Sequence, residues 1–449
     1  MHFTKRRLDL RAVGALAAAI AVAHATASCS SDRSVGVIDG DDADSSLPPL
    51  DDGGPTDAGL TDAPAPIRDA SMPDASPWPV TCTGASCATS LVTILGEGFC
   101  VLLQDKTVAC WGDNANGQLG RGSEVGNAPS ATAERVLDLA EIVSLDRACA
   151  IDTKGDTWCW GTGPWMRTAA ATTRENTPVK LPIPPAKAIR VARTTANAGT
   201  ACAVVESGVL CWGTNVNGTV MPPVPGATAA TPYPPQEARL PTGAQIRDLV
   251  RGDAAFALLE DGTAFSWGAN PPLARVSSLF PDPHPRPIML AGVTRIDATN
   301  DNVCAVAGAA VYCWGRPKLD AFVSPPPLER ALPKRIPMPE HVVDVSTCAS
   351  ANSSRNPLRG CAIGASGSLY CWGENGAGQV GDGTKAYALS PVKIDSLPEP
   401  VAQVRTTALS TCALLTSGRV FCWGDDSFGQ LGGGQLRVPS LVPQEVLLP

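Results

Sequence analysis

Residues 411–424 read TCALLTSGRVFCWG, which is two apolar segments separated by a glycine-bearing turn and ended by Cys-Trp-Gly. This pattern is typical of a β-hairpin. The Trp-Gly pair recurs along the chain at intervals of 49, 52, 55, 47, 58 and 51 residues. Its seven tryptophans are Trp111, Trp160, Trp212, Trp267, Trp314, Trp372 and Trp423. A period of about 50 residues indicates a propeller, in which each repeat forms one blade.

Other segments recur around the hairpin. An apolar segment precedes it, as at residues 137–143, 246–250, 342–345 and 401–404. A glycine-rich connection follows it, reading GDNANGQLG at 112–120, GENGAGQVG at 373–381 and GDDSFGQLG at 424–432. A short segment such as 391–394 or 443–446 closes the repeat. The sequence therefore predicts an all-β fold, a seven-bladed β-propeller of four-stranded blades, over residues 81–449.

These repeats resemble the regulator of chromosome condensation repeat family, whose signature is Gly-x-Val-x-x-Trp-Gly-x-Asn-x-x-Gly-Gln-Leu-Gly. The resemblance covers about residues 88–449 and is most specific in the first, sixth and seventh repeats. It is weaker in the second to fifth repeats, where the Gly-Gln-Leu-Gly end is degenerate or lost. The family implies seven blades. Kelch repeats and Trp-Asp repeats fit less well, because their Gly-Gly doublet and Trp-Asp pair are missing.

Because blades pack face to face, we expect continuous apolar strands, with the repeated tryptophans lying between neighbouring blades. An exposed set of rings that stacks on a ligand is the alternative role for these tryptophans. Long proline-rich connections follow Trp160, Trp212, Trp267 and Trp314, and an insertion occupies residues 349–358. Loops at equivalent points of a repeat emerge on one face, which is the expected place for a partner.

The N-terminus is predicted to be a signal peptide of the lipoprotein type, residues 1–28. A basic head is followed by the apolar run AVGALAAAIAVA at 12–23, which is too short to span a bilayer. Thr26-Ala27-Ser28 precede Cys29 and resemble a lipobox, which implies lipidation of Cys29. Since Thr26 replaces the usual leucine, ordinary secretory cleavage is the alternative. Attachment through Cys29 would place the protein in a bacterial cell envelope, at the outer membrane, cell surface or periplasm; without it the protein would be secreted.

Residues 29–80 are predicted to form a disordered linker rich in Asp, Pro and Ala, with little to bury. From residue 30 to 80 the chain carries eleven Asp and two Arg, or −9, while residues 1–29 carry +3. Since the whole chain carries −8, about −2 is left for the propeller. An almost neutral domain lacks the basic surface of a nucleic-acid-binding protein. Contact with a membrane is expected only through the lipid, and the chain is expected to be monomeric.

The cysteines recur in pairs nine or ten residues apart within the hairpins. The pairs are Cys100/Cys110, Cys149/Cys159, Cys202/Cys211, Cys304/Cys313, Cys361/Cys371 and Cys412/Cys422. The fourth repeat has Phe256 and Ser266 instead, so both cysteines are absent together. Hairpin geometry places each pair face to face and favours disulfides, which require an oxidising compartment. Zinc is disfavoured, because its ligands are spaced differently.

Three further cysteines belong to the folded part of the chain. Cys82 and Cys87 are predicted to pair with each other at the end of the linker. Cys348 is left over, and it is free, joined to another molecule, or in exchange with Cys82 or Cys87.

No catalytic motif, cofactor site or metal site is predicted. The expected mature chain has only His284 and His341, which leaves little for a nucleophilic triad. Asp113, Glu374 and Asp425 occupy one repeat position and are expected to shape turns. The resemblance implies binding of a protein, and a glycan is the other ligand class considered. A polysaccharide hydrolase or lyase and a guanine nucleotide exchange factor are the alternatives.

Overall fold

The computed structural model describes residues 76–449 except 85, 125, 164–172, 196–197, 221–231, 239, 242–244, 271, 300–301, 316–331 and 349–358. Within these ranges the chain forms seven four-stranded antiparallel sheets and no helix. The predicted all-β fold of seven blades is therefore confirmed. The signal peptide, Cys29 and the linker up to residue 75 lie outside the described residues.

The first four blades each use four consecutive strands. Blade 1 contains β1 (Ala88–Thr93), β2 (Gly98–Leu103), β3 (Val108–Gly112) and β4 (Ser130–Arg135). Blade 2 contains β5 (Ile142–Asp146), β6 (Cys149–Asp152), β7 (Thr157–Gly163) and β8 (Thr173–Lys180). Blade 3 contains β9 (Ala186–Thr195), β10 (Ala198–Val205), β11 (Gly208–Thr214) and β12 (Pro232–Glu237). Blade 4 contains β13 (Ile246–Arg251), β14 (Ala254–Leu259), β15 (Ala264–Gly268) and β16 (Asp282–Pro287).

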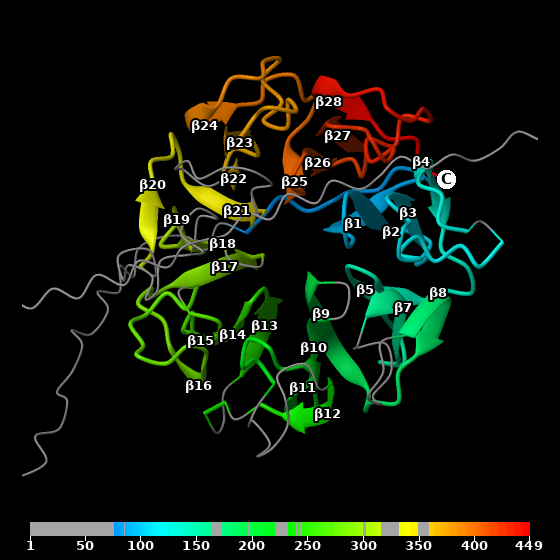
Figure 1. The fold of residues 1–449 in the computed structure, drawn as a ribbon. Helices are drawn as coiled ribbons and strands as arrows, with labels where there is room; N and C mark the ends of the chain where they lie inside the picture. The colour runs from blue at the N-terminus through cyan, green and yellow to red at the C-terminus, as the bar shows by residue number, and fades with distance from the viewer. Residues whose placement is uncertain are drawn as a thin grey trace, which may run out of the picture. The chain divides into compact units, whose positions relative to one another are not determined.

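The last three blades repeat this order. Blade 5 contains β17 (Val293–Ala298), β18 (Asn302–Ala307), β19 (Ala310–Gly315) and β20 (Lys334–Ile336). Blade 6 contains β21 (Val342–Thr347), β22 (Gly360–Gly364), β23 (Leu369–Gly373) and β24 (Ala388–Lys393). Blade 7 contains β25 (Val401–Thr406), β26 (Ser410–Leu415), β27 (Val420–Gly424) and β28 (Ser440–Glu445). Figure 1 shows the blades around a central axis, with the first strand of each blade innermost.

The opening strands differ from the prediction in two ways. The segment 137–143 is not the opening strand of blade 2, because Asp138 and Glu141 have φ of 52° and 57°, which breaks an extended backbone. That strand, β5, begins at Ile142 instead. Burial is continuous in second strands such as β2 and β26, but it is interrupted in innermost strands such as β5 and β25, which have one neighbour and a channel beside them.

The two faces of the ring differ because the strands of each blade are antiparallel. The first and third strands of a blade end on one face, and their connections to the second and fourth strands leave from it; we call it the loop face. The short turns between second and third strands lie on the opposite face, the hairpin face. All the long connections predicted from the sequence start on the loop face, including those after β7, β11, β15, β19 and β21.

The hydrophobic core is divided into seven clusters, each shared by two neighbouring blades. In six of them the two hairpin cysteines of one blade pack with the tryptophan of the next, as Cys100 and Cys110 do with Trp160. In the seventh, Phe256 of blade 4 takes the place of the cysteines, with its ring 6.1 Å from that of Trp314. The fourth repeat thus replaces a disulfide by an aromatic side chain in the same interface.

Most of the repeated tryptophans also hydrogen bond across the blade interfaces. Nε1 of Trp160 donates to Gln118 O at 2.8 Å, and Nε1 of Trp423 donates to Gln379 O at 3.0 Å. Both carbonyls lie in the glycine-rich connection of the preceding blade. Trp111 of blade 1 makes the same bond to Gln430 of blade 7 at 3.0 Å. The seventh interface is therefore built like the others, and it closes the ring.

Blade 7 takes all four strands from the C-terminal end of the chain, so ring closure uses no strand from the N-terminus. Instead the segment before β1 lies against the hairpin face of blades 6 and 7. Thr81 N donates to Thr416 O at 2.7 Å, Ala88 N donates to Gly418 O at 3.0 Å, and Trp78 Nε1 donates to Ala365 O at 3.0 Å. The described part of the chain therefore enters the propeller at its hairpin face.

Candidate functional site

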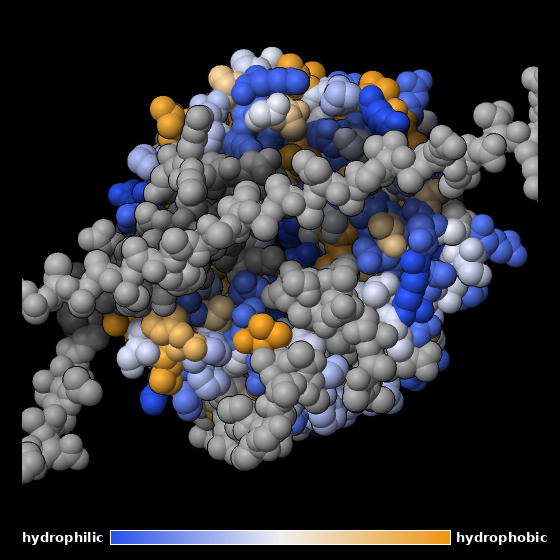
Figure 2. Space-filling model, in the orientation of Figure 1, coloured by the Kyte–Doolittle hydropathy of each residue, from blue (hydrophilic) through white to orange (hydrophobic). Residues whose placement is uncertain are grey.

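The innermost strands line a channel with charged and polar side chains. Arg190 Nη2 lies 2.6 Å from Asp248 Oδ1, and Arg405 Nη1 lies 3.6 Å from Asp344 Oδ2. Burial raises the pKa of Asp344, and also that of Asp146. Figure 2 shows hydrophilic residues in the depression at the centre of the ring.

Side chains of the channel also join neighbouring blades. Each innermost strand is the edge of its sheet, so its outward N–H groups need partners. Asp146 Oδ2 accepts from Val191 N at 2.8 Å, and Asp297 Oδ2 accepts from Thr347 N at 2.8 Å. Gln403 Oε1 accepts from Leu91 N at 2.9 Å, which again joins blade 7 to blade 1. In all three cases the acceptor belongs to the preceding blade.

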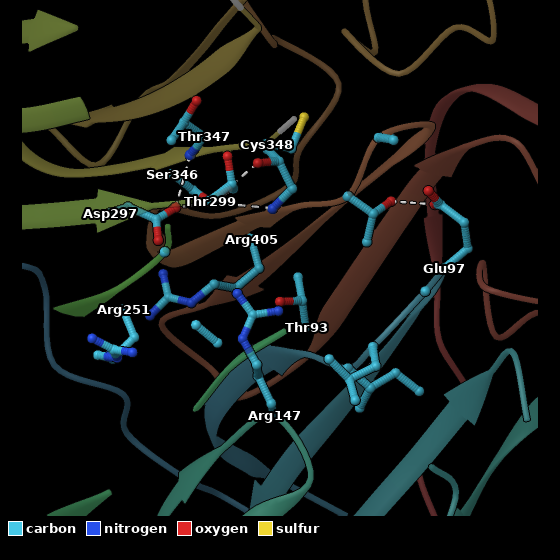
Figure 3. Close-up of a pocket in the computed structure, with 18 of the residues that line it drawn as sticks. Thr93, Glu97, Arg147, Arg251, Asp297, Thr299, Ser346, Thr347, Cys348 and Arg405 are labelled. Atoms are coloured by element: carbon cyan, nitrogen blue, oxygen red, sulfur yellow. Dashed lines mark hydrogen bonds between the residues drawn. The ribbon is translucent and has the colours of Figure 1, made fainter. Parts of the chain in front are cut away.

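The channel opens toward the loop face in a cavity of about 510 Å³. All seven blades contribute to it from the ends of their first strands or the residue that follows. One such residue from each blade is, in order, Thr93, Arg147, Ala192, Arg251, Asp297, Ser346 and Arg405. Figure 3 shows Arg147 and Arg405 extending into this cavity, with Glu97 on another side. The site therefore exists only in the assembled ring.

The charged groups of the cavity differ in how they are satisfied. Asp297 accepts from the Ser346 hydroxyl at 3.0 Å besides the Thr347 amide. Glu97 accepts from the Thr407 hydroxyl, and burial raises its pKa to about 7. Arg251 is buried beside the hydroxyls of Thr200 and Thr219, and burial lowers its pKa to about 9.

A second cavity, of about 760 Å³, occupies the channel toward the hairpin face. Its lining includes Ser76–Val80 together with residues of the innermost strands such as Ser144 and Asp344. The segment before β1 thus borders one end of the channel, while the cavity at the loop face lies among the long connections.

Cys348 lies at the edge of the cavity at the loop face and is buried and unpaired. Arg359 Nη1 lies 3.0 Å from its sulfur, and Asn302 Nδ2 donates to its carbonyl at 3.0 Å. Burial raises the pKa of this thiol. Of the alternatives predicted for Cys348, the structure shows a free thiol. Cys82 and Cys87 form a disulfide with each other.

The structure contains disulfides, as the paired cysteines predicted. They join Cys82–Cys87, Cys100–Cys110, Cys149–Cys159, Cys202–Cys211, Cys304–Cys313, Cys361–Cys371 and Cys412–Cys422. Six of them link residues directly opposite each other on the second and third strands of a blade, as in the Cys412–Cys422 register. Seven disulfides indicate an oxidising environment outside the cytosol.

Residues singled out in the sequence have structural partners. Asp113 Oδ1 accepts from Ala115 N at 2.9 Å, and Asp425 Oδ2 accepts from Ser427 N at 2.9 Å, so both shape the glycine-rich connections. His284 Nδ1 lies 3.1 Å from Asp282 Oδ1. His341 offers its carbonyl to Ala365 N at 2.8 Å. None of these residues lines the cavity at the loop face.

The arrangement is suited to binding. Its arginines, hydroxyls and amides can donate hydrogen bonds to a group that enters the cavity. Within the described ranges no cluster of three His, Cys, Asp or Glu is arranged to hold a metal ion. The same ranges contain no helix long and apolar enough to cross a membrane.

Comparison with known proteins agrees with the repeats. The signature described as "Regulator of chromosome condensation (RCC1) repeat" matches residues 366–414 and 417–449, and a second signature of that description matches 401–430. The C-terminal blades of this chain carry RCC1 repeats within a seven-bladed β-propeller. The propeller is 27% identical over 370 residues to the ultraviolet-B receptor UVR8 of Arabidopsis thaliana. The alignment covers 77% of this chain and 79% of the receptor.

Two solved structures share the fold. Prp20p of Saccharomyces cerevisiae gives a TM-score of 0.59 at 21% identity, over 76% of this chain and 85% of Prp20p. Human WBSCR16 gives a TM-score of 0.56 at 19% identity, over 76% of this chain and 94% of the human protein.

The sequence reasoning missed the arginines of the cavity. Arg147 and Arg251 occupy the same repeat position, one residue after the side chain that faces the channel, and Arg405 occupies the channel-facing position itself. Alignment of the opening strands by repeat would have shown this. No motif marks these residues, because they are 104 to 258 positions apart in the sequence.

Proposed function

We propose that this RCC1-repeat propeller is a non-enzymatic, exported protein that binds a protein partner through its loop face. The observation that carries the proposal is that every long connection leaves from one face, around a polar cavity to which all seven blades contribute. Rigid scaffolds with variable loops at one end commonly bind partners there. The disulfides support export, because they need an oxidising compartment.

Related proteins support protein binding. UVR8 is named as a receptor, and the work on Prp20p describes its binding to Gsp1p and histones. Exchange-factor activity remains an alternative, and nucleotide release from a panel of small GTPases tests it. A polysaccharide-acting enzyme is the other alternative. Glu97 and Asp297 are the carboxylates of the cavity at the loop face, and their hydrogen bonds to Thr407 and Thr347 give each a structural role.

Site-specific photocrosslinking tests the binding face. A photoreactive phenylalanine analogue is placed at Ala115 or Phe428, which are exposed on the loop face, and at Lys154 or Asp261 in turns of the hairpin face as matched controls. Irradiation of intact cells should give defined adducts from the first two positions and none from the controls. Adducts from the hairpin face alone, or equally from both faces, would contradict the proposal.

We further propose that Cys29 carries the lipid anchor and that residues 29–80 tether the propeller to the membrane. The support is the basic head, the short apolar run and the small residues before Cys29. Mass spectrometry of the N-terminal peptide should show a diacylglycerol on Cys29, and Cys29→Ser should release the protein from membrane fractions. A soluble protein that keeps an unmodified Cys29 would exclude the anchor.

A further inference from the structure

We propose that the cavity at the loop face is a carboxylate-binding subsite, which receives an acidic side chain of the protein partner between Arg147 and Arg405. The inference rests on the proposed function, since it takes the loop face as the binding face. It adds the chemistry of the contact and the residues that make it.

Arg147 is the first of three observations. It is the first residue of the two-residue turn between β5 and β6, and its φ is 52°, a conformation that glycine adopts more easily. Among the described residues none forms a hydrogen bond or salt bridge with its guanidinium, which extends into the cavity in Figure 3. Strained backbone of this kind is concentrated at functional sites. Asp146 is the nearby acidic residue on which its charge acts. A turn that holds an arginine over a cavity without a direct hydrogen bond or salt bridge is suited to an anionic ligand.

Arg405 supplies a second guanidinium from blade 7. Its Nη1 donates to Val404 O at 2.7 Å and forms a long salt bridge with Asp344 Oδ2 at 3.6 Å, a distance beyond that of a good hydrogen bond. The rest of the guanidinium reaches the cavity (Figure 3). Arginine binds carboxylates through two parallel N–H groups, so two guanidinium groups can hold one carboxylate in a fixed orientation.

Arg251 is a third arginine of the cavity, and its hydrogen-bonding capacity is only partly used. Its side chain is only 4% exposed, and its Nε and Nη1 have no hydrogen-bond partner among the described residues. Its Nη2 hydrogen bonds with the hydroxyls of Thr200 and Thr219, and Asp253 is the nearby acidic residue that acts on its charge. A buried, under-satisfied guanidinium is costly, and an anion in the adjacent cavity would offset part of that cost.

The acidic groups of the cavity do not balance these arginines. The lining has three arginines and two carboxylates: Asp297, whose donors Ser346 and Thr347 are neutral, and Glu97, whose raised pKa of about 7 leaves it only partly ionised at neutral pH. The lining at the loop face therefore has an excess of positive charge, while Asp146 and Asp344 lie in the adjoining cavity toward the hairpin face. Such a localised field attracts and orients an acidic group of a partner.

Titration calorimetry of the mature protein tests the subsite. The probes are hexaglutamate, the matched hexaglutamine and inorganic phosphate. We expect hexaglutamate to bind, more weakly at higher salt, and hexaglutamine not to bind. Arg147→Gln/Arg405→Gln should weaken hexaglutamate at least tenfold. The control Arg135→Gln/Arg419→Gln removes the same charge from exposed salt bridges elsewhere and should change affinity less than twofold.

Several results would overturn the subsite. They are an absence of hexaglutamate binding, equal loss in the control variant, or phosphate binding that displaces hexaglutamate and exceeds its affinity. Arg147→Gln alone breaks no hydrogen bond or salt bridge among the described residues, so it keeps the test valid if the double variant unfolds. The photocrosslinking experiment distinguishes failure of the subsite from failure of the binding face. If the photoreactive residue at Ala115 gives the same adducts in the Arg147→Gln variant, then the loop face binds the partner but the subsite does not contribute.

Discussion

Restoring the missing disulfide of blade 4 should make the protein less stable. In the Phe256→Cys/Ser266→Cys variant the new cysteines face each other, because Phe256 pairs directly with Ser266 in the β14–β15 register. The equivalent pairs in other blades have Cα atoms about 4 Å apart and form bonds. The disulfide should therefore form, but Phe256 is fully buried against Trp314, and its ring is lost.

The magnitudes decide the sign. Closing a hairpin of this length adds about 3 kcal/mol by the chain-entropy estimate. Replacing a buried phenylalanine by alanine costs about 3–5 kcal/mol, and a cysteine, slightly larger, should cost about 3 kcal/mol. Ser266 also loses two hydrogen bonds, one to Leu273 O at 2.6 Å and one from Arg275 Nε at 3.2 Å, at about 1 kcal/mol each. The oxidised variant should be about 2 kcal/mol less stable than the parent.

Urea unfolding followed by tryptophan fluorescence measures the difference, and thiol titration of the denatured protein verifies the new bond. Ser266→Ala is the control that removes the hydroxyl alone. If the oxidised variant is more stable than the parent, then Phe256 contributes little to the blade 4–blade 5 interface, and our account of its substitution for a disulfide is wrong.

Three further predictions follow from buried groups. The pKa of Glu97 is raised from 4.5 to about 7, so the folded state keeps this proton at pH values where the unfolded state has lost it. The free energy of unfolding should therefore fall by up to about 3 kcal/mol as pH rises from 4.5 through 7. Glu97→Gln should flatten this pH dependence in urea titrations. The pKa of Asp282 is lowered to about 2, because its hydrogen bonds with Ser277 and Arg275 outweigh the effect of burial. Its stabilisation of the fold should be present above about pH 4 and disappear toward pH 2. Asp282→Asn should cost about 3–5 kcal/mol, because it leaves Arg275 buried without its charge partner. Cys412→Ala/Cys422→Ala should lower the free energy of unfolding by about 3 kcal/mol, because it removes the disulfide of blade 7. Reduction can then no longer act on unfolding through this disulfide. An unchanged urea midpoint would refute its stabilising role.

The sequence predicted the blades well because their signals are local and repeated. The cysteine spacing within one hairpin sets the register, and the glycine of its turn takes a left-handed conformation, as at Gly418 with φ of 85°. Seven copies of such a signal make the count of blades secure. The opening strand of blade 2 was misplaced because apolar composition at 137–143 does not reveal the positive φ of Asp138 and Glu141.

The channel could not be predicted in the same way. Its contacts join residues that are far apart in the sequence, such as Arg190 with Asp248 or Asp146 with Val191. These charges are placed beside one another only by the closure of seven blades. A single innermost strand shows a polar residue among apolar ones, and that pattern alone does not distinguish a channel from an exposed surface.

The way the chain enters the propeller bears on the proposed anchor. Ser76 lies beside the channel at the hairpin face, so a tether that begins at Cys29 would join the propeller on the face opposite the long connections. The 47 positions from Cys29 to Ser76, treated as a flexible chain, have a root-mean-square extension of about 40 Å. Attachment at the hairpin face would leave the loop face and the arginines of its cavity accessible to a partner. A lipid anchor and a binding site on opposite faces can then act at the same time.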